Sequence, residues 1–281
     1  MFIRTTCAAT SLLATAAFAD GHVHPMGYAL ANDGMTLLTM EHLGKPSDIA
    51  SFDLAEPVHA IAYRPVTGDL LGFSRAGKVF VIDASTGEMT DTGAAFDDGA
   101  EIGAGAVAFD FNNKIDAVRA VGSDGANLVY FPADFGGDKA NTVKRFTDTF
   151  YAEGDANAGK TPSIFANAYT NAIAGAKASG TYQYALDAQT DALVSLANNA
   201  GELKTIGPIT VDGTAVDLMG AGGFDIISPE EGTDMAYALL QMEGADVSGL
   251  YSIDLATGAA TQMAELGVTG LMGFAVSMGG E

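Results

Sequence analysis

The chain contains nearly the same phrase twice, and this repeat decides the fold. Residues 249–266 read GLYSIDLATGAATQMAEL, and residues 78–93 read KVFVIDASTGEMTDTG. In each phrase an apolar, β-favouring run meets a turn, at Gly258 or Gly87, and a second run returns. Glycine suits such turns because it adopts positive φ at no steric cost. One hairpin cannot bury a face alone, so the repeat predicts a stacked or circular array of sheets.

Four copies of a unit of four strands follow from the same pattern. They occupy about residues 58–95, 104–148, 165–209 and 222–266. This length and strand count are typical of a propeller blade.

The two ends of the chain complete a fifth unit. Residues 270–277 resemble a first strand with nothing after it, and residues 27–54 resemble the other three strands. Closing a loop of some 250 residues costs about 5 kcal/mol. Several hydrogen bonds of about 1 kcal/mol each offset that cost, and closure removes an exposed sheet edge. We therefore predict an all-β, five-bladed β-propeller that forms a single domain, residues 20–281, closed by pairing of the C-terminal strand with the N-terminal strands. An open sandwich is the alternative.

The first nineteen residues have the features of a signal peptide. A short basic start precedes a run of small and apolar residues that ends in Ala17-Phe18-Ala19, a cleavage pattern. An ordinary N-terminal helix is the alternative. The chain after this point has no cysteine and no run long enough for a membrane helix. We expect a periplasmic or secreted protein without a membrane span.

The charge of the chain limits its partners. Its 13 basic and 35 acidic side chains give a net charge of −22. Such a surface repels phosphate backbones and anionic lipids, so we expect no nucleic-acid partner. The acidity is explained by solubility, or by weak binding of divalent cations.

Three stretches resemble a known family. Residues 109–136, residues 168–212 and the phrase at 249–267 are similar to bacterial domain of unknown function 4394. The sequence departs from the family pattern at FNN, where FNP is usual, and at GANLV, where GQNLR is usual, so that Val129 stands in place of Arg. The resemblance implies an exported, propeller-like protein and implies no particular chemistry.

The predicted innermost strands are rich in glycine and alanine, and polar residues lie in or after them. Convergent polar groups in a concavity predict a binding site for a small molecule or a protein partner at the mouth of the central channel. Alternatively, these side chains hydrogen-bond turn backbones. The candidate ligand-binding residues are Arg64, Asp110, Asn112, Asn167, Asn171 and Asp225.

An enzyme is the main alternative to a binding protein. Channel Asp and Asn residues with calcium would suit a calcium-assisted hydrolase or a lactonase-like enzyme. A centre plugged by Tyr63, Tyr169 and Phe224 would favour a scaffold instead. A surface-layer or adhesion module, the third class, would expose apolar patches on the outer strands.

A second candidate metal site lies at the predicted mature N-terminus. Cleavage after Ala19 would leave Asp20-Gly21-His22, whose amine, backbone nitrogens and imidazole suit copper or nickel in a square plane. His24 would add an axial ligand. A disordered leader is the alternative.

One motif is misleading. Residues 154–161, GDANAGKT, fit the phosphate-binding loop of nucleotide hydrolases. That loop needs a helix to begin at its Lys and Thr, but Pro162 biases Thr161 away from helix. We predict a loop that connects two blades.

Overall fold

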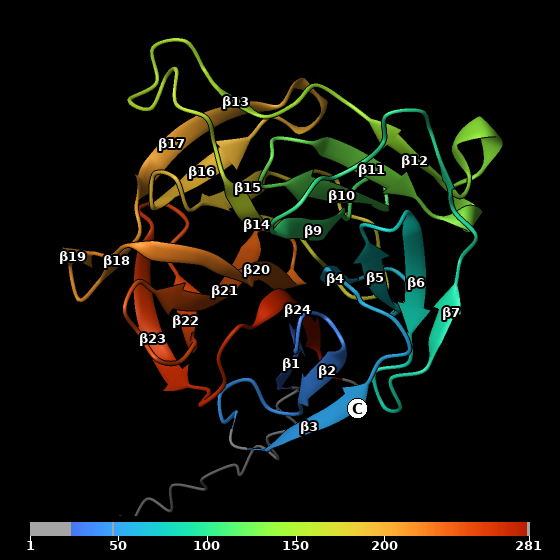
Figure 1. Cartoon of the computed structure of the whole chain (residues 1–281), viewed down its shortest axis with the longest axis horizontal. Helices are drawn as coiled ribbons and strands as arrows, with labels where there is room; N and C mark the ends of the chain where they lie inside the picture. The colour runs from blue at the N-terminus through green and yellow to red at the C-terminus, as the bar shows by residue number, and fades with distance from the viewer. Residues whose placement is uncertain (1–23, 47, 280–281) are drawn as a thin grey trace, which may run out of the picture.

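The computed structural model describes residues 24–279 except Ser47, and Figure 1 shows five sheets arranged as a ring around a central axis. Every sheet contains four main antiparallel strands, and the strands of each sheet are given below in order from the axis outward. The five sheets are called blades 1 to 5 in chain order. Within the described part of the chain, no helix has the length and apolar character needed to cross a membrane.

The four main strands of each blade have the following bounds. Blade 1 contains β24 (Met272–Met278), β1 (Pro25–Ala31), β2 (Thr36–Met40) and β3 (Ile49–Asp53). Blade 2 contains β4 (Ala60–Tyr63), β5 (Leu70–Ser74), β6 (Lys78–Ile82) and β7 (Met89–Asp91). Blade 3 contains β9 (Val107–Asn112), β10 (Ala117–Gly122), β11 (Asn127–Phe131) and β12 (Thr142–Arg145). Blade 4 contains β14 (Ile164–Tyr169), β15 (Gln183–Asp187), β16 (Ala192–Leu196) and β17 (Glu202–Pro208). Blade 5 contains β20 (Leu218–Glu230), β21 (Thr233–Met242), β22 (Gly249–Ile253) and β23 (Ala259–Glu265).

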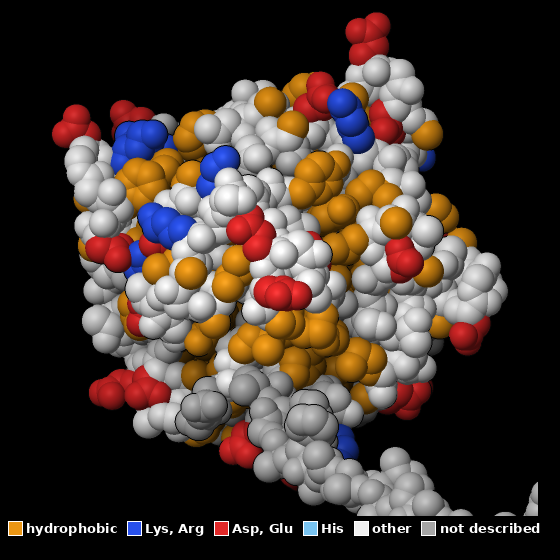
Figure 2. Space-filling model, turned by 180° about the vertical axis from the view of Figure 1, so that it is seen from behind, with side chains coloured by type: hydrophobic (Ala, Val, Ile, Leu, Met, Phe, Trp, Pro, Cys, Tyr) orange, Lys and Arg blue, Asp and Glu red, His pale blue; other side chains and the backbone are white. Residues whose placement is uncertain are grey.

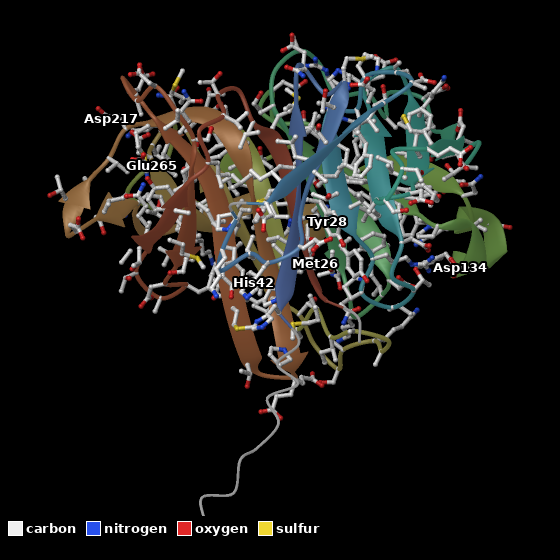
Figure 3. All side chains as sticks on the ribbon, turned by 90° about the horizontal axis from the view of Figure 1, so that it is seen from below. Met26, Tyr28, His42, Asp134, Asp217 and Glu265 are labelled. Carbon is white, nitrogen blue, oxygen red and sulfur yellow. The ribbon has the colours of Figure 1, made fainter. Side chains whose placement is uncertain are left out.

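Blade 1 closes the ring as predicted. Strand β24, at the C-terminal end, pairs antiparallel with β1, and Tyr28 lies opposite Ala275. The Tyr28 hydroxyl lies 3.2 Å from Ser277 Oγ across this pair. Figure 3 shows Tyr28 on β1 within this blade. The two ends meet again where the Gly279 N–H donates to the His24 carbonyl at 3.1 Å.

The repeated turn phrase behaves as the sequence predicts. Gly87 and Gly258 have φ of 76° and 82°, and each follows a strand that ends at Ile82 or Ile253. In both turns the amide of the glycine donates to the carbonyl of an aspartate four residues earlier at 2.8 Å. The predicted blade-connecting loop over residues 154–161 is also confirmed, because it lies between two strands and contains no helix.

Three connectors add strands that the sequence did not predict. The chain leaving blades 2, 3 and 4 pairs in parallel with the outer strand of the following blade. Each added strand covers a sheet edge that would otherwise offer unpaired backbone groups. The added strands are β8 (Ala95–Phe96), β13 (Phe150–Tyr151) and β18 (Thr210–Val211), the last extended by β19 (Thr214–Ala215).

The hydrophobic core lies in the seams between neighbouring blades. Five main clusters of buried side chains occupy the five seams of the ring. The cluster between blades 5 and 1 includes Leu239 and Leu250 from blade 5 and Phe274 from β24. Closure therefore buries apolar surface on both faces of blade 1.

Shortening the side chain of Phe274 tests whether β24 is an integral strand. Phe274 is 3% exposed, so Phe274→Ala should lower the free energy of unfolding by roughly 3–5 kcal/mol. Met263→Ala, on the outer strand of blade 5 at 40% exposure, should change it by less than about 1 kcal/mol. Urea unfolding measures both, and equal small effects would contradict the closed ring.

Candidate ligand site on the propeller axis

The inner strands of the five blades surround a cavity of about 10 Å³, room for about one water-sized group. Each strand contributes two or three consecutive residues to its lining. In β14 the last lining residue is Asn167. In the other four inner strands the last lining residue is apolar, namely Ile61, Phe109, Phe224 and Phe274. One blade thus places an amide in a layer that is otherwise apolar.

Asn167 lacks the partners that a buried amide requires. Asn167 is 1% exposed, and neither its Oδ1 nor its Nδ2 has a hydrogen-bond partner among the described residues. Leaving a buried polar group unpaired costs about 1–3 kcal/mol, so native structures rarely retain one without a reason. Asn167 shares a face of β14 with Tyr169, since side chains alternate along a strand. The Tyr169 hydroxyl accepts from Arg119 Nε at 2.8 Å, so this face points to blade 3.

Two carboxylates lie one residue further along the inner strands. Asp110 follows Phe109 and Asp225 follows Phe224, whereas alanine occupies the corresponding place in the other three strands. Asp110 Oδ2 accepts from the Tyr169 backbone N–H of blade 4 at 2.7 Å. Asp225 Oδ2 accepts from the Val276 N–H of blade 1 at 2.5 Å. Each carboxylate therefore satisfies a backbone N–H of the next inner strand.

The two carboxylates influence each other electrostatically. Burial, together with the negative charge of Asp225, raises the pKa of Asp110 well above its ordinary value. Burial also raises the pKa of Asp225, to about 7, against the opposing effect of its backbone N–H bonds. Arg119 lies opposite Asp110 in the strand register, but its guanidinium donates to Tyr169, Asn127 and Asn199. At neutral pH the pair is therefore only partly ionised.

A wider cavity opens where the inner strands begin. It has a volume of about 210 Å³ and shares Val107, Phe165 and Gly273 with the axial cavity. We call it the axial funnel, and its wall is mostly glycine and apolar side chains. A Cβ at Gly222, where φ is 121°, would lie 1.9 Å from the Leu239 carbonyl oxygen. The funnel is lined by Asp33, His59, Gly105, Ala106, Val107, Phe165, Gly220, Ala221, Gly222, Gly270, Leu271, Met272 and Gly273.

His59 places an imidazole at the rim of the funnel. Its Nδ1 accepts from the Arg75 backbone N–H at 3.3 Å, which leaves Nε2 as the protonated nitrogen of the neutral ring. Burial, reinforced by the charge of Arg75, lowers the pKa of His59. The rim histidine is therefore neutral at pH 7, and the exposed side chain of Asp33 also lines the funnel.

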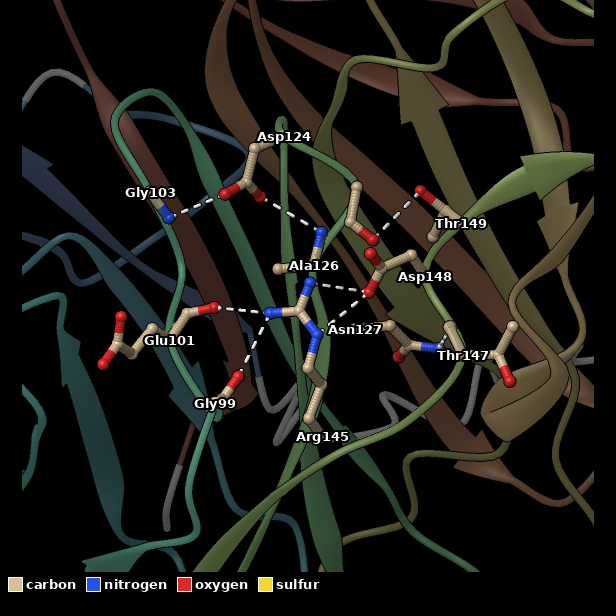
Figure 4. Close-up of polar contacts among 11 residues, drawn as sticks. Gly99, Glu101, Gly103, Asp124, Ala126, Asn127, Arg145, Thr147, Asp148 and Thr149 are labelled. Atoms are coloured by element: carbon tan, nitrogen blue, oxygen red, sulfur yellow. Dashed lines mark hydrogen bonds and ion pairs between the residues drawn. The ribbon is translucent and has the colours of Figure 1, made fainter.

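Polar contacts hold the connector that leads into the rim (Figure 4). Arg145 donates to the carbonyls of Gly99 and Glu101 at 3.2 and 3.0 Å, and Asp124 accepts from the Gly103 N–H at 2.7 Å. Arg75 Nη1 then donates to the Gly105 carbonyl at 2.7 Å. The rim is thus positioned before any ligand binds.

The opposite end of the axis is narrow. A cavity of about 10 Å³ contacts Asp110 and Asp225 and is otherwise lined mainly by apolar groups, including Tyr63 and Met278. Figure 2 shows that apolar side chains gather at the centre of the face opposite to that of Figure 1. Asp110 and Asp225 line this cavity, whereas neither lines the axial cavity or the axial funnel.

Arg64 holds two blades together. Its Nε and Nη2 donate to both carboxylate oxygens of Asp116 at 2.8 and 2.6 Å. Nη2 also lies 2.8 Å from Asp134, which Figure 3 labels on the short helix η1 (Ala133–Phe135). These contacts raise the pKa of Arg64, with Asp116 as the largest cause. Arg64 is used in an ion-pair network between blades 2 and 3, away from the axial cavities.

Asn112 and Asn171 support turns, as the structural alternative predicted. Asn112 Oδ1 accepts from the Lys114 N–H and from the Thr181 hydroxyl. Asn171 has φ of 59°, and its amide bonds to the Gly180 carbonyl and the Gly232 N–H. Of the six predicted residues, Asp110, Asn167 and Asp225 thus lie on the axis.

The plug of three aromatic rings that would favour a scaffold is present only in part. Phe224 lines the axial cavity, whereas Tyr63 lines the cavity at the far end. The Tyr169 hydroxyl lies in the seam between blades 3 and 4, in the polar network of Arg119.

The predicted N-terminal metal site falls mostly outside the described residues, which exclude Asp20 and His22. His24 is described, and its ring stacks on His42 with 4.0 Å between centroids. Among residues 24–279 apart from Ser47, no group of three or more His, Cys, Asp or Glu side chains is arranged to hold a metal ion. The structure therefore leaves the copper or nickel prediction untested.

Two larger depressions lie nearer the perimeter, with volumes of about 390 and 420 Å³. The first involves Arg75 and Asp98, and the second involves Tyr63 and Glu88. Neither contains a buried polar atom that lacks a partner, among the residues described. The axial funnel is smaller, but it leads to such an atom, and we therefore take it as the candidate site.

Replacing Asn167 by an apolar residue should stabilise the protein. Asn167→Leu matches the layer of Ile61 and Phe109, so the free energy of unfolding should rise by roughly 1–3 kcal/mol. Asn112→Leu is the matched control, because it removes an amide that is bonded, and it should be destabilising. Urea unfolding of both variants decides, and destabilisation by Asn167→Leu would show that the amide is a structural group.

The raised pKa of Asp225 predicts a pH-dependent stability. An aspartate titrates near 3.9 in the unfolded chain and, here, near 7 in the folded one, so the folded state binds more protons between these values. The contribution of Asp225 to stability is therefore greatest below about pH 4 and falls as the pH rises to about 7. The difference in unfolding free energy between wild type and Asp225→Asn should fall by roughly a few kcal/mol over this range. A difference independent of pH would contradict the burial of this charge.

Comparison with known proteins identifies the family. The model of a domain of unknown function, DUF4394, matches residues 35–275. A search of the curated proteins finds no match. Among solved structures, glutaminyl cyclase of Myxococcus xanthus is 11% identical with a TM-score of 0.40, over 89% of this chain and 73% of that one. A protein of unknown function from Bacteroides thetaiotaomicron is 12% identical with a TM-score of 0.41, over 81% and 55%. The chain, a five-bladed propeller by its own strand order, belongs to the DUF4394 family.

Proposed function

We propose that this propeller is an exported binding protein that takes a small ligand into the axial funnel. The ligand's body lies against the glycine and apolar wall, and its polar end reaches Asn167. The observation that carries the proposal is the unpartnered amide of Asn167 at the inner end of the funnel. The features of a signal peptide in residues 1–19 support export.

The energetics favour binding over a purely structural role for Asn167. Four blades show that an apolar residue is accommodated at this position, so the ring does not require an amide there. A ligand that hydrogen-bonds to Asn167 recovers the free energy lost by burying its polar atoms. The stability sacrificed in the free protein is then returned on binding, a pattern typical of functional residues.

Pre-organisation also supports a binding role. The rim at Gly105 is fixed by Arg75, and the connector before it by Arg145 and Asp124. A rigid rim reduces the ordering cost that a ligand must offset. No observation favours the calcium-assisted hydrolase over binding, and that alternative stays a prediction.

Blocking the funnel tests the proposed function. We expect 1-butanol, an uncharged probe with a short apolar body, to bind wild type weakly, with chemical-shift changes in the NMR spectrum at Phe165 and Asn167. Ala221→Phe and Ala106→Phe, on two walls of the funnel, should weaken binding by about tenfold or more. Ala256→Phe, in an exposed turn of blade 5, is the control of equal bulk and should have no effect.

Two results would contradict the proposal. One is 1-butanol binding that survives both funnel variants while their melting temperatures show a folded protein. The other is no binding to wild type, seen as no chemical-shift changes at the funnel residues up to the highest 1-butanol concentration at which the protein stays folded and soluble. Two separate walls are used so that misfolding of one variant does not decide the test.

A further inference from the structure

Resting on the proposed function, we infer that the ligand of the axial funnel is a small organic cation, a primary ammonium on a short apolar body. Its ammonium group enters the axial cavity, where Asn167 Oδ1 accepts a hydrogen bond. The carboxylates of Asp110 and Asp225, one residue deeper along β9 and β20, supply the opposing charge. The apolar body remains in the funnel.

The charge along the axis determines the sign of the ligand. Asp110 and Asp225 are 5% and 4% exposed, and both line the cavity at the far end. Their hydrogen-bond donors are backbone N–H groups of Tyr169, Ile226 and Val276, which are neutral. Buried carboxylates without a bonded cation favour a positive group nearby.

The residues that line the funnel include no cationic side chain. The lining of the funnel contains the carboxylate of Asp33 and the neutral ring of His59, and no Lys or Arg. Arg75, close to the rim, directs its Nη1 to the Gly105 carbonyl.

The size of the axial cavity limits which organic cations can enter it. Its volume of about 10 Å³ accepts one group about the size of water. A primary ammonium has this size and three donors. A trimethylammonium group is larger than the cavity and cannot donate to Asn167. The cavity thus separates primary ammonium ions from quaternary ones.

Three probes with one butyl body test the inference in wild-type protein. At pH 8, n-butylammonium should bind at least about tenfold more tightly than 1-butanol, since aliphatic amines are protonated there. n-Butyltrimethylammonium should bind no better than 1-butanol. The ratio of the two dissociation constants, ammonium to alcohol, measures the selectivity without any mutation.

Charge-neutralising variants locate the source of that selectivity. Asp110→Asn and Asp225→Asn should each reduce the ratio of n-butylammonium affinity to 1-butanol affinity several-fold. Asp98→Asn removes the same charge at an exposed site and is the matched control, with no expected change. Asn167→Leu should weaken both probes, because it removes the acceptor that both use.

The outcomes distinguish failure of the cationic ligand class from failure of the proposed function. If 1-butanol binds in the funnel but n-butylammonium binds no more tightly, the cationic class is wrong and the proposed function stands. The same conclusion follows if n-butyltrimethylammonium binds as well as the primary ion. If neither probe shifts the funnel residues, the proposed function itself fails.

Discussion

The pairing of β24 with β1 is the constraint on which the rest of the molecule depends. Without it, blade 1 would have three strands, and blades 5 and 2 would lose the contacts that their inner strands β20 and β4 make with β24. The axial cavities would also disappear, since β24 supplies Gly273 and Phe274 to their lining and Val276 to the hydrogen bond of Asp225. A ligand site on the axis therefore exists only in the closed ring.

Closure of the ring explains why two buried carboxylates lie on the axis. Five inner strands meet there with backbone N–H groups that face no neighbouring strand, and these need acceptors. Asp110 and Asp225 satisfy two of them, each reaching from one blade to the next. The same carboxylates are then forced into a confined space, where burial raises their pKa values. The same geometry thus supplies acceptors for two backbone N–H groups and raises the pKa values of the two carboxylates that accept from them.

The sequence was sufficient for the fold because its signals were local and repeated. The apolar periods, the turn glycines such as Gly87 and Gly258, and the unmatched strands at the two ends fixed the blade count. The roles of polar residues were harder to predict. Arg64 bonds to Asp116, 52 residues away, and no pattern in the sequence indicated that pairing. Asn167 was one of six candidate ligand residues, and nothing in the sequence singled it out, because its lack of a partner depends on five strands meeting. The short parallel strands of the connectors were missed since two residues are too few for a periodic signal.

Those connector strands have a mechanical consequence. They tie blade 2 to blade 3, blade 3 to blade 4, and blade 4 to blade 5 by backbone hydrogen bonds, so pulling these blades apart requires shearing a sheet. Among the described residues, the seams on either side of blade 1 have no such strand, and besides side-chain packing they are bridged by isolated hydrogen bonds, from the Val276 N–H to Asp225 and from the Val58 N–H to the Gly34 carbonyl. Under load the wheel should break first at the segment that completes it, leaving a connected arc of four blades.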